Sequence, residues 1–169
     1  MDECFAYNYE QARNTDLRVG AYHFLSYDSG GDTQAANFLP TCRWRKICFH
    51  RSLTCSLRRQ GRKPTGSGIG DKRTDDLYSE DRGALRNEAV IYATEKSYAL
   101  YLAGDHEEYD IWIRGVYTTP ILSDGRSWIF WRYTNRAHLA GYSCEEVFID
   151  MNVFCRTAEE FAEYPGKNA

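Results

Sequence analysis

The sequence contains no apolar run that approaches the roughly 18–20 residues needed to cross a bilayer. It also lacks a basic N-terminal region followed by an apolar stretch, so no signal peptide is visible. Acidic residues are absent between Cys42 and Gly70, where eight basic residues occur, although the net charge of the chain is only −3. These absences argue against a membrane-spanning protein and mark residues 42–70 as a break in composition.

The composition otherwise fits one globular domain. With 169 residues the chain is long enough for one core and too short for two typical domains. Aromatic residues make up 15% of the sequence, which is a high share. Such residues usually pack in cores, but ligand sites also use them, and sugars stack their C–H faces on flat rings. The aromatic residues are therefore candidates for both roles.

The N-terminal part alternates helices and strands as in an α/β fold. Apolar residues at helical spacing predict a helix over 3–14, and an apolar run predicts a strand over 17–25 that is buried on both faces. A Ser-Gly-Gly-Asp loop follows, and a short helix is expected to run to Leu39 with Asp32 or Thr33 as its N-cap.

The C-terminal part continues the same pattern. Thr94 is expected to cap a helix that ends near Leu102, and a last helix is expected over 158–164. Strands are predicted over residues 90–93, 111–114, 128–133 and 146–152. Because α/β barrels keep their chemistry at the carboxyl ends of their strands, polar and aromatic residues there are candidate site residues.

Residues 42–86 show neither the period of a strand nor that of a helix. The glycines of residues 66–70 lack the Gly-Lys-Ser/Thr ending of a phosphate-binding loop, and the Cys and His residues of this part have spacings that fit no zinc site. We therefore expect no metal and no cofactor. A patternless stretch of this length is unusual inside a compact domain.

Three segments of the chain resemble the lysozymes of glycoside hydrolase family 25. They are residues 18–24 with the helix after them, residues 90–94, and, most specifically, residues 128–154 with WIFWRYT and GYSCEEVFIDMNVF. The resemblance implies an irregular TIM-like β/α barrel. This chain is expected to be an incomplete form, a single domain over 1–169 that lacks the first strands and keeps about five or six.

By the same resemblance, residues 42–88 should hold the fourth strand with an Asp-x-Glu pair, and a helix after it. Regrouping the possible codons of residues 42–57 in another reading frame gives LPPVVDVQF, which is similar to that strand. Regrouping residues 58–88 in the other direction gives an amphipathic pattern with helical spacing. We therefore interpret residues 42–88 as the product of a double frameshift and expect an aberrant, disordered segment.

The resemblance also implies the site. Family 25 places acids on its first, fourth and last strands, and here only the acid of the last strand, Asp150, is present. The substrate-binding candidates are Tyr22, Tyr92, Trp112, Trp131, Tyr133 and Asn152. Core packing is the alternative for the aromatic residues and is favoured for Trp112. His23 is expected to be structural, and Arg132 replaces the glutamine that is usual in the family.

The implied activity is that of a muramidase, which cleaves the β-1,4 bond between N-acetylmuramic acid and N-acetylglucosamine in peptidoglycan, in the cell wall or outside the cell. Because glycoside hydrolysis usually needs two carboxyl groups, we expect impaired or no turnover. The alternative is a non-catalytic, peptidoglycan-binding remnant of the barrel. A third hypothesis, nucleic-acid binding by the basic residues 43–63, ranks last because the frame change accounts for their charge. The expected partner is therefore the glycan strand, with no nucleic acid and no membrane.

Overall fold

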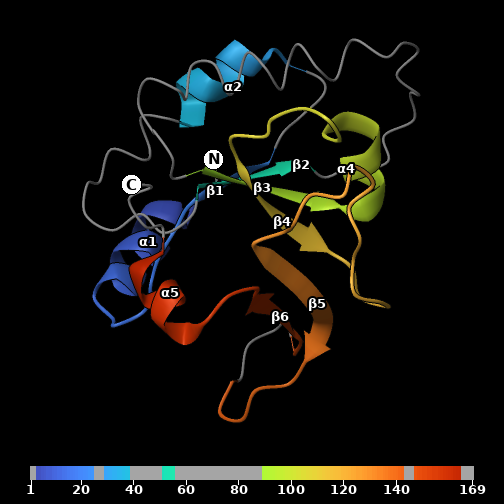
Figure 1. The fold of residues 1–169 in the computed structure, drawn as a ribbon. Coiled ribbons are helices and arrows are strands. Elements are labelled where there is room, and N and C mark those ends of the chain that lie inside the picture. Colours follow the sequence, from blue (N-terminus) through green and yellow to red (C-terminus); the bar gives the residue numbers. More distant parts are fainter. Residues whose placement is uncertain (1–2, 25–28, 39–50, 56–88, 143–146, 165–169) are drawn as a thin grey trace. The chain divides into compact units, whose positions relative to one another are not determined.

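The structure is a computed structural model that describes residues 3–24, 29–38, 51–55, 89–142 and 147–164 (Figure 1). The chain divides into two compact units. The N-terminal unit consists of Met1–Thr54 and Arg59–Val90, and the C-terminal unit consists of Cys55–Arg58 and Ile91–Ala169. Within the described ranges, no helix combines the length and the apolar composition that crossing a membrane requires.

The described residues of the N-terminal unit form two helices and two short strands. They are α1 (Phe5–Arg13), β1 (Tyr22–Phe24), α2 (Gly31–Phe38) and β2 (Arg51–Cys55). Strands β1 and β2 pair in parallel, with Tyr22 opposite Ser52. The predicted first helix is confirmed. The second begins at Gly31, so Asp32 and Thr33 both lie inside its first turn and neither is its N-cap.

The strand predicted over 17–25 is shorter and less buried than expected. Only Tyr22–Phe24 is a strand, and the side chains of Tyr22 and Phe24 are 69% and 45% exposed. The prediction that both faces are buried is therefore wrong. His23, which alternates with them, packs toward α2, because successive side chains of a strand point to opposite faces. An apolar sequence does not determine whether a second layer covers each face.

Strand β2 lies inside the segment that the sequence pattern left without regular structure. It runs over Arg51–Cys55, and its residues 52–54 form a parallel ladder with β1. The pattern did not predict this strand, because backbone pairing needs no alternation of side chains. The rest of residues 42–88 lies outside the described residues, so the expectation of an aberrant segment stays a prediction.

In the described part of the C-terminal unit there are four strands, in the order β3-β4-β5-β6, and two helices. These elements are β3 (Ala89–Thr94), α4 (Glu95–Tyr101), β4 (Asp110–Arg114), β5 (Phe130–Ala137), β6 (Ile149–Phe154) and α5 (Ala158–Glu163). Each strand and helix predicted for this part is confirmed, with ends that differ by a few residues. The largest shifts are at β5, which runs four residues further, and at β6, which begins three residues later.

Strand β6 runs antiparallel to β5, whereas β4 and β5 are parallel. The expected alternation of helices and parallel strands therefore fails at this last step. The connection, residues 138–148, is shorter than the dozen or more residues that a parallel crossover usually needs. The antiparallel direction places the start of β6 beside the carboxyl end of β5, with Ile149 opposite Ala137.

The core of the C-terminal unit lies on one face of β3 and β4. Its described hydrophobic side chains that are at most 1% exposed are Ile91, Ala93, Tyr98, Leu102, Ile111 and Ile113. Helix α4 begins with a capping box, in which the Thr94 hydroxyl accepts from the Ser97 backbone N–H and the Ser97 hydroxyl accepts from the Thr94 N–H. Tyr92 and Trp112 alternate with the buried residues and are only half-buried. They therefore lie on the opposite face.

Candidate functional site

The candidate site is a group of five side chains from four neighbouring strands. Tyr92 comes from β3, Trp112 from β4, Arg132 from β5, and Asp150 and Asn152 from β6. We call these residues the carboxylate cluster. Four of them were predicted site residues, and the antiparallel direction of β6 brings its start, with Asp150, to the edge where β4 and β5 end.

Arg132 connects two members of the carboxylate cluster. Its Nη2 donates to Asp150 Oδ1 in an ion pair, and its Nη1 donates to the Tyr92 hydroxyl oxygen at 3.0 Å. Its guanidinium carbon also lies 6.0 Å from the centroid of the Tyr92 ring. The side chain of Asp150 remains 47% exposed. Arg132 therefore holds the carboxylate in place while leaving it open to solvent.

Trp112 and Asn152 form the second half of the cluster. The indole Nε1 of Trp112 donates to Asn152 Oδ1 at 2.9 Å, and its ring meets that of Tyr92 edge to face, with centroids 5.5 Å apart. A third ring, that of Phe130, lies 5.6 Å from Trp112. Trp112 is thus partly a packing residue, as expected, and it also orients the amide of Asn152.

The surroundings of Tyr92 keep its hydroxyl protonated. Burial raises the pKa of Tyr92, and the charge of Asp150 raises it further. The charge and hydrogen bond of Arg132 and the charge of Arg114 lower this pKa, but they do not outweigh burial. Since the Tyr92 oxygen accepts from Arg132, its own O–H remains a donor for a ligand on this face.

The carboxylate cluster contains one acid. Asp150 has one oxygen engaged by Arg132, so the other is the oxygen that a sugar would meet. Within the described ranges, no group of three His, Cys, Asp or Glu side chains could hold a metal ion. The cluster offers a carboxylate, an amide and aromatic surface, which is a set that can bind a sugar but lacks the second carboxyl group usual for glycoside hydrolysis.

Trp131 and Tyr133 lie apart from the carboxylate cluster. They alternate with Arg132 along β5, so they face the other side of the strand. The indole Nε1 of Trp131 donates to the Gly115 carbonyl oxygen at 2.7 Å, and its ring centroid is 6.0 Å from that of Tyr133. Trp131 thus has a structural contact, and the substrate-binding roles of both residues stay predictions.

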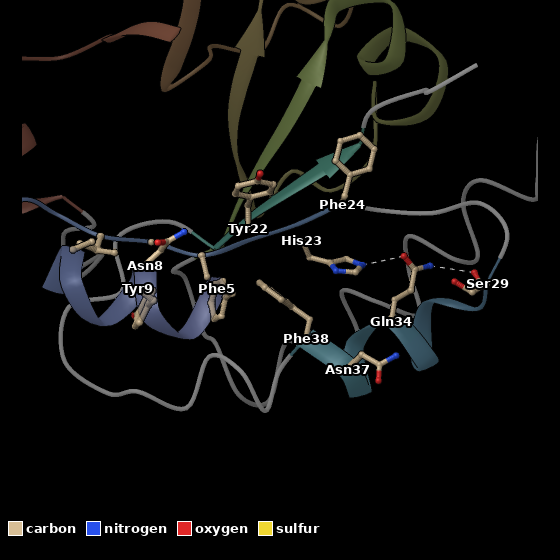
Figure 2. Close-up of a pocket in the computed structure, with 14 residues that line it drawn as sticks. Phe5, Asn8, Tyr9, Tyr22, His23, Phe24, Ser29, Gln34, Asn37 and Phe38 are labelled. Carbon is tan, nitrogen blue, oxygen red and sulfur yellow. Dashed lines mark hydrogen bonds between the residues drawn. The ribbon is translucent and has the colours of Figure 1, made fainter. Parts of the chain in front are cut away.

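Tyr22 belongs to the N-terminal unit, where a pocket of about 870 Å³ is lined by residues of α1, β1 and α2 (Figure 2). His23 Nε2 donates to Gln34 Oε1 at 3.0 Å, since the Gln34 amide nitrogen itself donates to the Ser29 carbonyl at 3.1 Å. Gln34 is 4% exposed. These contacts agree with the structural role expected for His23. Figure 2 shows Tyr22 on the other side of β1 from His23.

Comparison with known proteins identifies the family. The model of the glycosyl hydrolases family 25 matches residues 1–142. The chain belongs to this family. A solved family 25 glycosyl hydrolase from Bacillus anthracis is 37% identical, with a TM-score of 0.88, over 97% of this chain and 76% of that one. The resemblance seen in the sequence is thereby confirmed.

Two further relatives show which share of longer proteins this chain matches. The lysozyme from Streptomyces coelicolor shares the fold with a TM-score of 0.81 at 22% identity, covering 96% of this chain and 78% of that one. The uncharacterized protein YegX from Escherichia coli (strain K12) is 27% identical over 164 residues, which are 97% of this chain. This chain spans 58% of the length of YegX. The expected family 25 barrel type is confirmed.

Among family 25 residues, Arg132 is the one whose role sequence reasoning missed. The resemblance to the family places Arg132 where a glutamine is usual, but this difference does not predict its partners. The sequence did contain a partial signal for this role. A cation inside a strand that is half-buried is usually paired with an acid, so an ion pair of Arg132 could have been expected. Which acid would be that partner depended on the pairing of β5 with β6.

Proposed function

We propose that this chain is a lysozyme-like glycoside hydrolase directed at peptidoglycan, with impaired or absent turnover. The bond addressed is the β-1,4 linkage between N-acetylmuramic acid and N-acetylglucosamine, in the cell wall or outside the cell. The observation that supports this proposal best is the carboxylate cluster, in which Asp150 stands beside Tyr92, Trp112 and Asn152 at the carboxyl edge of β4 and β5.

Asp150 is the catalytic residue in this proposal. Its carboxylate stabilises positive charge at the anomeric carbon or orients the N-acetyl group of the substrate. Tyr92 and Asn152 are the neighbouring groups that contact the sugar. The impairment follows from the single acid of the cluster, because general acid catalysis by a second carboxyl group is worth roughly 10²–10⁴-fold in rate.

The test of turnover is the clearing of a suspension of bacterial cell walls. The wild-type chain should lyse the walls slowly at most, and Asp150→Asn should abolish any lysis without changing the fold, because the amide is isosteric with the carboxylate. Asp105→Asn is the matched control, since Asp105 is exposed in the loop after α4 and lies outside the cluster. Measurable lysis by the wild type that is equalled by Asp150→Asn would exclude Asp150 from catalysis.

The second candidate function is binding of peptidoglycan without cleavage. It is favoured by the engagement of Asp150 with Arg132, which leaves the aromatic and amide groups of the cluster as the main binding surface. Sedimentation of the chain with insoluble peptidoglycan, in the absence of wall clearing, would support binding alone. A chain that neither clears nor sediments with the polymer would contradict both candidates.

A further inference from the structure

The loop after β4 presents an aromatic ring to solvent. Tyr117 is 96% exposed, which is the highest value for a large hydrophobic or aromatic side chain in the described ranges. Its ring therefore contributes almost nothing to the core. A single exposed ring is common on protein surfaces and points to no partner by itself. What makes Tyr117 a candidate is its position, on an ordered loop that follows the carboxyl end of β4.

Both ends of this loop are anchored by indole groups. Trp131 Nε1 donates to the Gly115 carbonyl at 2.7 Å, and Trp128 Nε1 donates to the Pro120 carbonyl at 3.2 Å. The two indole rings also contact each other, with centroids 5.8 Å apart. Residues 115–120 are thus held at both ends, with Tyr117 between the two anchors.

The backbone at Gly115 is closely packed as well. A Cβ added there would lie 3.3 Å from the Thr118 carbonyl oxygen and 3.4 Å from Glu95 Oε2, which is tighter than most real contacts. The loop therefore folds back on itself at this glycine. Because it is already ordered, binding through Tyr117 would cost little conformational entropy beyond that of one side chain.

The anchored loop begins at the carboxylate cluster. The backbone N–H of Gly115 donates to the Arg132 carbonyl at 3.2 Å, one residue after the end of β4. Loops at the carboxyl ends of the strands are where β/α barrels bind their substrates. A glycan strand seated at Asp150 would extend along this edge, so Tyr117 is placed to meet a sugar other than the one at the carboxylate.

We propose that Tyr117 is a stacking platform for a further sugar ring of a β-1,4-linked N-acetylhexosamine strand. This proposal rests on the proposed function and adds a binding subsite to it. The neighbouring Thr118 and Thr119 are exposed and polar, so the ring is flanked by hydroxyl groups suited to a sugar. A protein partner would need a larger continuous apolar patch, and the two threonines and the buried Pro120 separate Tyr117 from the exposed Ile121.

The test measures retention on insoluble peptidoglycan for the wild-type chain, Tyr117→Ala, Tyr117→Phe and Tyr7→Ala. Tyr117→Ala should lower the apparent affinity roughly threefold to tenfold, and Tyr117→Phe should keep it, because the ring face and not the hydroxyl makes the contact. Tyr7→Ala is the matched control, since Tyr7 is 66% exposed on α1. A soluble chitin tetramer should compete with the polymer for the wild type and only weakly for Tyr117→Ala.

The outcomes separate the subsite from the function on which it rests. If the wild type is retained and Tyr117→Ala is retained equally, the platform is overturned and the proposed function stands. If Tyr117→Phe loses as much as Tyr117→Ala, a hydrogen bond replaces stacking and the platform is overturned too. If the wild type is not retained at all, both proposals fail.

Discussion

The two units differ in how firmly their helices and strands are packed. Among the residues whose side chains the structure describes, the largest that are less than 2% exposed all lie in the C-terminal unit, except Val90. By contrast, α1 of the N-terminal unit buries no residue, and β1 exposes Tyr22 and Phe24. The carboxylate cluster lies in the C-terminal unit, whose described side chains are the more deeply buried.

The helix ends show the same difference. Thr94 and Thr157 each begin a helix of the C-terminal unit with a complete capping box. In the N-terminal unit Cys4 is the N-cap of α1, and its side chain makes no capping hydrogen bond. Local sequence and tertiary packing therefore agree in the C-terminal unit, whereas in α1 the helical spacing is supported by neither cap nor burial.

The largest expected effect is on the core of the C-terminal unit. Ile113→Ala should lower the free energy of unfolding by about 2–5 kcal/mol, because Ile113 is 0% exposed and its removal leaves a cavity. Leu17→Ala in the N-terminal unit should change it by less than about 0.5 kcal/mol, since Leu17 is 73% exposed. Urea denaturation followed by tryptophan fluorescence measures both. Equal losses would show that the units do not differ as described.

The second largest loss of stability is expected when Asp124 is replaced, because its carboxylate holds loops of the C-terminal unit together. Asp124 accepts from the Tyr98 hydroxyl at 2.6 Å and from the N–H groups of Gly104 and Arg126 at 3.1 Å each. Burial raises the pKa of Asp124, but these hydrogen bonds outweigh burial and lower it below the ordinary value of 3.8. Asp124→Asn should cost about 1–2 kcal/mol, near the lower end for bonds to a charged group because Asp124 is exposed.

The sign of the pH dependence follows from the lowered pKa of Asp124. Its contribution is present above the ordinary pKa and is lost as the pH falls through the lower value of the folded state. Wild-type stability should therefore fall below about pH 4 more steeply than that of Asp124→Asn. Urea midpoints measured at several pH values check this, and parallel curves would assign the acid sensitivity to other groups.

Smaller changes in stability are expected at the N-caps of α4 and α1, and they should differ between the two units. Thr94→Ala should destabilise the C-terminal unit by about 1 kcal/mol, because it removes the hydroxyl that accepts from the Ser97 N–H. Cys4→Ser should change the stability of α1 by less than about 0.5 kcal/mol. The backbone at Cys4 is helical (φ −88°, ψ −2°) and not extended, so a serine hydroxyl there is poorly placed to cap the helix. Amide hydrogen exchange in the first turn of each helix reports both changes. A large change of exchange in α1 of Cys4→Ser would contradict this account.

The smallest change in stability is expected at the carboxylate cluster. Arg132→Gln should cost less than about 1 kcal/mol, since its ion pair with Asp150 is open to solvent. Because Arg132 lowers the pKa of Tyr92, the variant should raise that pKa further. Titration of carbon-13-labelled tyrosine, with Tyr92→Phe to assign the signal, measures the shift. An unchanged Tyr92 titration would show that Arg132 does not contact this hydroxyl in solution.

Most elements of the C-terminal unit could be predicted because their signals are local. The apolar run at residues 90–93, the cap at Thr94 and the alternation in β4 each lie within a few residues. In the N-terminal unit the same kind of signal identified α1 but overstated the burial of β1. Strand β2 had no signal of this kind, since it is defined by its ladder with β1.

Four of the candidate site residues lie together in the structure, but their arrangement could not be predicted from the sequence. Tyr92, Trp112, Asp150 and Asn152 were chosen from their places in the sequence, and the structure brings them together. Trp131 was chosen by the same reasoning but faces the other side of β5. Alternation along a strand separates two sets of side chains, yet it does not show which set faces the neighbouring acid.

The sequence by itself determined the family and the α/β class, because these depend on residue identity and short-range pattern. Only the tertiary structure decided that β6 turns back against β5, that Arg132 meets Asp150 and Tyr92, and that two indoles anchor the loop of Tyr117. These contacts join residues that are distant in the chain. Their formation depends on strand direction and register, which no local pattern contains.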